Sequence, residues 1–119
     1  MRLAQDEPEL ERNAVRYSTK PLLPYRYLPG LHPHPVTNEH GHSYGASDES
    51  HPPWQPEEWH TLEDWRYGVD LCNQHYYWES HKAWEGLWLA VPRRSVPYRF
   101  LQGMIKLSAA LLKGRLAML

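Results

Sequence analysis

The sequence has very little cysteine and no long hydrophobic run. Cys72 is the only cysteine among 119 residues, so the chain cannot form an internal disulfide. No apolar stretch approaches the roughly 20 residues that cross a bilayer, and acidic residues near the N-terminus stand where a signal peptide needs apolar ones. We therefore expect a cytoplasmic protein that does not enter a membrane.

A strong excess of charge of one sign is also missing. The 13 Lys and Arg residues face 14 Asp and Glu residues, which gives a formal net charge of -1. This balance offers no electrostatic reason to expect nucleic acid or an anionic membrane as the partner. The chain is rich instead in six tryptophans, eight tyrosines and eight histidines, which predict a core of large rings and supply candidate metal ligands.

Proline divides the chain near residue 56. Nine of the eleven prolines lie in residues 1–56, together with Gly30, Gly41 and Gly45, and this composition excludes a long helix or a central strand there. We expect residues 1–56 to form a mostly irregular Pro- and His-rich arm, and residues 57–119 to form a helical domain.

The second part of the chain has the periodicity of helices. Apolar residues spaced 3, 4, 3 and 4 apart mark one helix face: Leu62, Trp65, Val69, Cys72 and Tyr76. They predict a helix over 58–75. A second helix over 77–90 should end before Pro92, and a third should run over 97–113, where Gly114 is a stop signal. Three amphipathic helices with short links predict an all-α fold, a small helical bundle.

The helix predicted over 77–90 places ionisable residues among aromatic rings. At about 100° per residue, one side holds Tyr77, Trp78, His81, Trp84, Glu85 and Trp88, and the other holds Glu79, Lys82 and Gly86. An unpaired buried carboxylate costs several kcal/mol, so Glu85 needs a partner. His81, four residues earlier, is one candidate, and a divalent cation held by both side chains is the other. The sequence leaves both readings open.

A metal site would need further ligands, because zinc takes three or four. We expect the arm to bring His34 and His42 to the His81 and Glu85 pair, although both histidines are equally readable as polar loop residues. Asp70 lies beside the first apolar stripe, where it could orient His81 or serve only as a boundary residue.

Several separated blocks resemble one family. His81 to Trp88 matches H-x-x-x-E-x-x-W, and YGVDLCNQHYYWESHKAWEGLW and FLQGMIKLSAALLKG extend the similarity. From Tyr25 to Lys113 the chain resembles the bacterial and archaeal family known as domain of unknown function 309. The resemblance implies an all-helical fold and suggests a metal-dependent hydrolase, with His81, Glu85 and Trp88 as the motif and His34 and His42 in the arm.

The chain also departs from this family. Lys82 stands where members often have glutamate, and His75 stands where a small residue is usual. The family domain tends to continue with another helical segment beyond Gly114. We therefore expect a helical domain that is shorter at its C-terminus than the family pattern and lacks one wall of its bundle.

Two functional hypotheses follow. In the first, one divalent metal ion activates water for hydrolysis, with His81 as a ligand and Glu85 as a ligand or general base. Trp84 and Trp88 form walls that exclude water, and Tyr77 and Asp70 complete the pocket. In the second, the bundle is non-catalytic and forms a homo-oligomer or covers its exposed apolar helices with another protein. The His81 and Glu85 pair then only fixes helix register. Neither hypothesis involves nucleic acid or a membrane.

Overall fold

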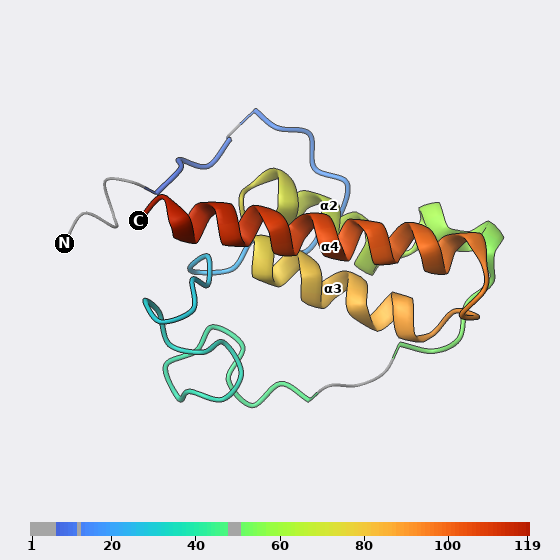
Figure 1. The fold of residues 1–119 in the computed structure, drawn as a ribbon, viewed down its shortest axis with the longest axis horizontal. Helices are drawn as coiled ribbons and strands as arrows, with labels where there is room; N and C mark the ends of the chain where they lie inside the picture. Colours follow the sequence, from blue (N-terminus) through green and yellow to red (C-terminus); the bar gives the residue numbers. More distant parts are fainter. Residues whose placement is uncertain (1–6, 12, 48–50) are drawn as a thin grey trace.

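The computed structural model describes residues 7–11, 13–47 and 51–119, and its helices all lie from Pro56 onward (Figure 1). A 3-10 helix η1 (Pro56–Thr61) precedes the α-helices α2 (Glu63–Asn73), α3 (Tyr77–Leu89) and α4 (Val96–Ala117). The described residues contain no strand, and those before Pro56 form turns and loops. The predicted all-α class, with three main helices, is confirmed.

The helix predicted over 58–75 is in fact two elements. Pro56 opens the short η1, and Leu62 then adopts an extended conformation with φ of -72° and ψ of 123°, which separates η1 from α2. At the other end, His75 has a φ of 68° in the left-handed region, so the chain turns sharply between α2 and α3. These two backbone breaks define α2 as an 11-residue helix.

The third predicted helix is longer than expected. The Ser95 hydroxyl caps α4 by accepting from the Tyr98 N–H at 3.3 Å, and Pro97 occupies the first turn. The prediction that Gly114 ends the helix was wrong, because α4 continues to Ala117. A glycine stops a helix when it takes a positive φ, and Gly114 does not.

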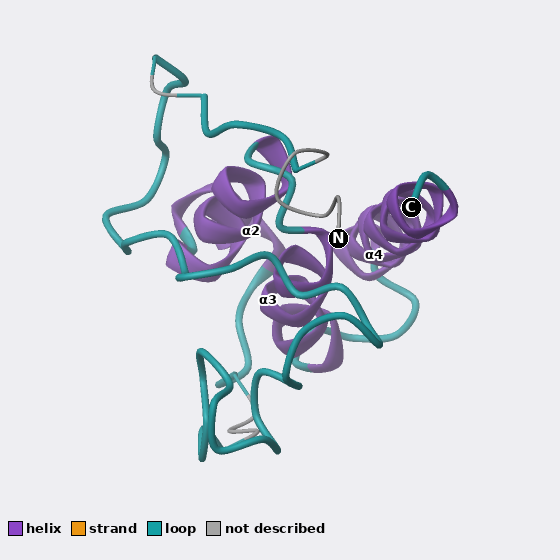
Figure 2. Cartoon of the chain, turned by 90° about the vertical axis from the view of Figure 1, so that its left-hand side faces the viewer, coloured by secondary structure: helices purple, strands orange, loops and turns teal. Residues whose placement is uncertain are grey.

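Helix α3 lies between the other two α-helices. It packs along α2 and along α4, and Figure 2 shows these two helices on different sides of it. The main apolar core gathers around the C-terminal half of α3 and consists of Trp54, Trp84, Leu87, Val91 and Leu101. Because α2 and α4 do not pack extensively on each other, part of the apolar surface of α4 stays exposed.

The contact between α2 and α3 depends on one glycine. A Cβ atom on Gly68 would lie 2.0 Å from Nε1 of Trp84, whose ring is completely buried. The indole N–H of Trp84 donates to the carbonyl of Trp65 at 3.3 Å. The absence of a side chain at Gly68 therefore lets the largest core ring lie directly against the α2 backbone.

The irregular arm is bound to the helices by polar contacts. The Arg26 side chain donates to the carbonyl of Gln74 at 2.7 Å, and the Tyr76 hydroxyl donates to the carbonyl of Leu23 at 2.7 Å. The indole N–H of Trp54 donates to the carbonyl of Leu87 at 3.0 Å, which fixes this arm ring within the core. None of the helices described is long and apolar enough to pass through a bilayer.

Candidate functional site

His81 and Glu85 form a pair at the surface of α3. Nε2 of His81 lies 3.0 Å from Oε2 of Glu85, and the two side chains keep 31% and 34% of their surface exposed. The predicted contact is present, but the predicted burial was wrong. The core side of α3 is formed by Ser80, Trp84 and Leu87, so each paired residue follows a core residue and points about 100° away from it.

The aromatic residues expected to enclose this pair contact other elements instead. Trp84 stacks on Trp65 of α2 with ring centroids 5.5 Å apart, and Trp88 stacks on Tyr98 of α4 at 5.0 Å. The Tyr77 hydroxyl lies 2.8 Å from Nδ1 of His75, and burial raises the pKa of Tyr77. These rings hold the helices together, so the predicted dry pocket was wrong.

The four predicted metal ligands do not come together. His34 accepts the backbone N–H groups of Val36 at 3.1 Å and Thr37 at 3.2 Å through Nδ1, which makes it a structural loop residue. The part of the chain that the structure describes contains no group of three or more His, Cys, Asp or Glu side chains able to hold a metal. An arm histidine that does lie beside this part of α3 is His51, whose Cβ lies 4.0 Å from the position of a Cβ on Gly86.

Asp70 binds the arm and does not orient His81. Its carboxylate accepts hydrogen bonds from the Arg16 side chain at 2.9 Å, from the Tyr17 N–H at 2.9 Å and from the Ser18 N–H at 3.0 Å. Its side chain is fully buried beneath this segment. The role predicted for Asp70 next to His81 was therefore wrong, because the arm covers the side of α2 on which Asp70 lies.

The buried histidine and glutamate pair of this fold is His42 with Glu79. Nε2 of His42 lies 2.7 Å from Oε2 of Glu79, and their side chains are only 1% and 3% exposed. The same carboxylate oxygen accepts the Tyr27 N–H at 2.9 Å. Sequence periodicity placed Glu79 on the far side of the helix, but the arm covers that side. The burial of Glu79 thus depends on residues that are distant in the sequence.

Ser43 extends this pair to a chain of three side chains. Its hydroxyl lies 2.8 Å from Nδ1 of His42. Nε2 of His42 faces the carboxylate of Glu79 and Nδ1 faces the Ser43 hydroxyl, and the tautomer of His42 sets which partner donates in each contact. The segment from Gly41 to Gly45 reads GHSYG and fits the G-x-S-x-G pattern of nucleophilic serines, so the sequence does carry a signal for Ser43.

The surroundings of Ser43 do not support catalysis. A serine nucleophile needs free N–H groups that stabilise the oxyanion. The N–H groups of Ser43, Tyr44 and Gly45 instead donate to loop carbonyls at 2.9, 3.2 and 3.2 Å. The Ser43, His42 and Glu79 chain therefore attaches the loop to α3.

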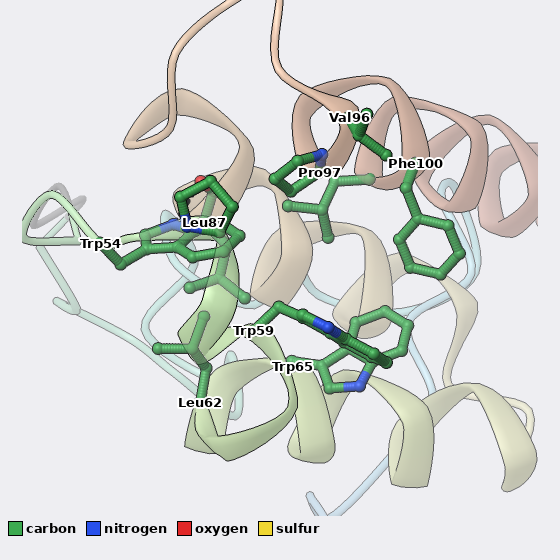
Figure 3. Close-up of a pocket in the computed structure, with 10 residues that line it drawn as sticks. Trp54, Trp59, Leu62, Trp65, Leu87, Val96, Pro97 and Phe100 are labelled. Atoms are coloured by element: carbon green, nitrogen blue, oxygen red, sulfur yellow. Dashed lines mark hydrogen bonds between the residues drawn. The ribbon is translucent and has the colours of Figure 1, made fainter.

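A largely apolar pocket lies where η1 and the start of α2 meet the start of α4 (Figure 3). Its volume is about 380 Å³. It is lined by Trp54, Pro56, Trp59, Leu62, Trp65, Leu87, Val96, Pro97, Phe100 and Leu101. The Trp54 N–H is already bonded to a carbonyl, and no charged residue contributes to the lining. The pocket therefore suits an uncharged apolar group.

Exposed apolar residues continue from this pocket along α4. Phe100 belongs to the pocket, and Leu107 and Leu111 follow it after seven and eleven residues on the same side of the helix. Their exposure follows from the position of α4, which covers α3 without packing broadly on α2.

One family model matches the chain, under the description Domain of unknown function (DUF309), over residues 65–117. These residues are similar to that family. The expected resemblance is confirmed over this range, which is just under half of the chain. No curated protein and no solved structure matched the chain in the two other comparisons.

The residues matched by the family model do not contain the whole apolar pocket. Trp65, Phe100 and the other α3 and α4 residues that line it lie within the matched range, whereas Trp54, Pro56, Trp59 and Leu62 precede it. The arm and η1 therefore add a wall to the matched helices and convert an open helix surface into a concave site.

Proposed function

We propose that this protein is a non-catalytic interaction module whose apolar pocket receives a hydrophobic side chain of another protein. The pocket itself carries this proposal, because it is concave, accessible and nearly without polar atoms. Interfaces of this kind gain most of their affinity from a few aromatic or aliphatic anchors that fill such pockets. In this function His81 and Glu85 are a surface pair and take no part in chemistry.

The rim of the pocket supports an apolar partner. Val96 is 80% exposed, and Trp59 and Phe100 each keep close to half of their surface exposed. Burying such side chains contributes roughly 25 cal/mol for each Å² of apolar area removed from water. A cluster of exposed large apolar residues around a concavity is a recognised mark of an interaction site.

An uncharged fluorescent probe tests whether the pocket binds apolar groups. N-phenyl-1-naphthylamine should bind the wild type saturably with one site per chain, and its emission should rise as it leaves water. Val96→Asp places a charge at the rim and should weaken binding at least about tenfold. The matched control is Val15→Asp, because Val15 is 67% exposed and does not line the pocket. Absence of saturable binding, or equal binding by all three proteins, would contradict the proposal.

The metal-dependent hydrolase suggested by the family resemblance is supported only by the His81 and Glu85 pair. Its atoms are 3.0 Å apart and accessible, as two ligands of a divalent ion would be. Two ligands do not satisfy a zinc site, and His34 and His42 are bonded elsewhere. The residues present therefore do not fit a complete metal site, and no reaction step follows from them.

Elemental analysis separates the two functions. We expect protein purified without chelator to carry no stoichiometric divalent metal, and His81→Ala to leave its metal content unchanged. The matched control is His40→Ala, because His40 is an exposed loop histidine. Near-stoichiometric metal in the wild type and in His40→Ala that is lost only in His81→Ala would establish the metal site and replace the interaction module as the leading function.

A further inference from the structure

The near-zero net charge hides a strong separation of charge along the chain. All 14 acidic residues lie at or before Glu85, in a stretch that holds only seven Lys and Arg residues. Six basic residues and no acidic residue follow: Arg93, Arg94, Arg99, Lys106, Lys113 and Arg115. The last third of the chain, which forms α4 and the turn before it, is therefore strongly positive.

This positive charge is available to a partner. Five of the six basic residues are exposed, namely Arg93, Arg94, Arg99, Lys106 and Lys113. None of these five forms an ion pair with a carboxylate among the residues described. The charge of α4 is thus not neutralised within the fold.

The basic residues flank the exposed apolar residues. Arg99, Lys106 and Lys113 recur every seven residues and share one side of α4. Arg99 and Lys106 each precede an exposed apolar residue, Phe100 and Leu107, so the two rows run parallel and about 100° apart. If the helix of a partner packed on the apolar row, one side of that partner helix would lie close to the basic row.

Two glycines of α4 lie in the same region. Gly103 and Gly114 are exposed, and a Cβ atom on either would meet no other atom within 4 Å. A larger residue would therefore fit at either position within the described chain. It would also favour the helix, because glycine weakens a helix interior. Because Gly103 and Gly114 have no side chains and lie between the apolar row and the basic row, the backbone of a partner could approach α4 closely there.

We infer that the partner presents an acidic amphipathic helix, which lies along α4 with its apolar side on Phe100, Leu107 and Leu111 and an anchor in the pocket. This inference rests on the proposed interaction function and adds the chemistry of the partner. Carboxylates on that helix pair with Arg99, Lys106 and Lys113 and set its orientation.

The charge and the shape of the surface disfavour two other occupants. A second copy that paired α4 with α4 would bring unneutralised cations on both helices together, which opposes association. A bilayer is flat on the scale of one helix, whereas the apolar residues of this surface lead into a concave pocket that a projecting side chain can fill.

Two synthetic helical peptides test the inference. Both carry the same leucine row with one tryptophan, and their remaining positions are glutamate in one and lysine in the other. Measured by fluorescence anisotropy at low salt, the glutamate peptide should bind at least about tenfold tighter, and added salt should reduce the difference. Lys106→Glu should weaken binding of the glutamate peptide severalfold. Lys20→Glu, at an exposed lysine outside α4, is the matched control and should not.

The outcomes separate the two proposals. Equal affinity for both peptides, with the naphthylamine probe still bound, would overturn the acidic partner and leave the interaction module standing. Failure of the probe and of both peptides to bind would overturn both. A concentration-dependent dimer lost in Lys106→Glu, or binding to phosphatidylglycerol vesicles without binding to the glutamate peptide, would also overturn the inference and assign the surface to a second copy or to a membrane.

Discussion

Asp70 is a buried carboxylate that several arm residues hold by hydrogen bonds. Burial alone would raise the pKa of its carboxyl, but hydrogen bonds from Ser18, Tyr17 and Arg16 outweigh burial, so its pKa is lowered. The charged form is therefore favoured in the folded protein. The stability that it contributes is present above the ordinary pKa of 3.8 and is lost as the pH falls through the lowered value.

Asp70→Asn should destabilise the protein by about 2–3 kcal/mol near neutral pH, because it removes a buried charge and leaves donors of the arm poorly satisfied. Urea unfolding measures this loss. Below pH 4 the free energy of unfolding of this variant should fall less steeply with pH than that of the wild type, because the variant has no carboxylate at position 70 to protonate. Asp64→Asn, which removes an exposed ion pair with Lys20, should cost less than about 1 kcal/mol. Similar losses in both variants would show that Asp70 does not anchor the arm.

Residue-level sequence reasoning succeeded where partners are close in the chain. The contact of His81 with Glu85 follows from helix geometry, since residues four apart are neighbours. The burial of Glu79 could not be predicted in this way, because its partners Tyr27 and His42 lie 52 and 37 residues away. An ionisable residue on the polar side of a helix looks solvated until the segment that covers it is known.

At the scale of elements, two helical glycines have opposite requirements. Helix propensity favours alanine at both Gly68 and Gly103. At Gly68 the new methyl group would collide with Trp84, so Gly68→Ala should destabilise by about 1–3 kcal/mol. At Gly103 it meets open space, so Gly103→Ala should stabilise by about 0.5–1 kcal/mol. The melting temperatures of the two variants measure these opposite effects. A change of melting temperature in the same direction for both would show that the room for a Cβ atom does not decide the effect.

Element boundaries were predictable where the sequence carries a backbone signal. The helix expected over 77–90 is observed over Tyr77–Leu89, because Pro92 and the turn before it end the periodic pattern. The break at Leu62 has no such signal, since leucine is a good helix former, yet Leu62 is extended between η1 and α2. Glycine at position 114 predicted a helix end, but α4 continues through it to Ala117.

At the scale of the whole molecule, the helical spacing of apolar residues predicted the all-α class, but it did not predict which helix lies between the other two. The central position of α3 decides which apolar residues of α4 remain exposed, and it results from contacts between elements. The predicted site failed for the same reason. Aromatic rings were taken to mark one buried surface, whereas Trp84 and Trp88 pack against different helices.

The insertion of Trp54 into the core has a consequence for cooperativity. This ring comes from the segment before the residues that match the family model, yet it packs with Trp84, Leu87 and Leu101 and bonds to the α3 backbone. The range defined by family similarity is therefore smaller than the set of residues that build this core. We therefore expect amide protons of the C-terminal half of α3 to be protected from hydrogen exchange only while the preceding segment is in place, and opening of that segment to expose the helix centre and the pocket together.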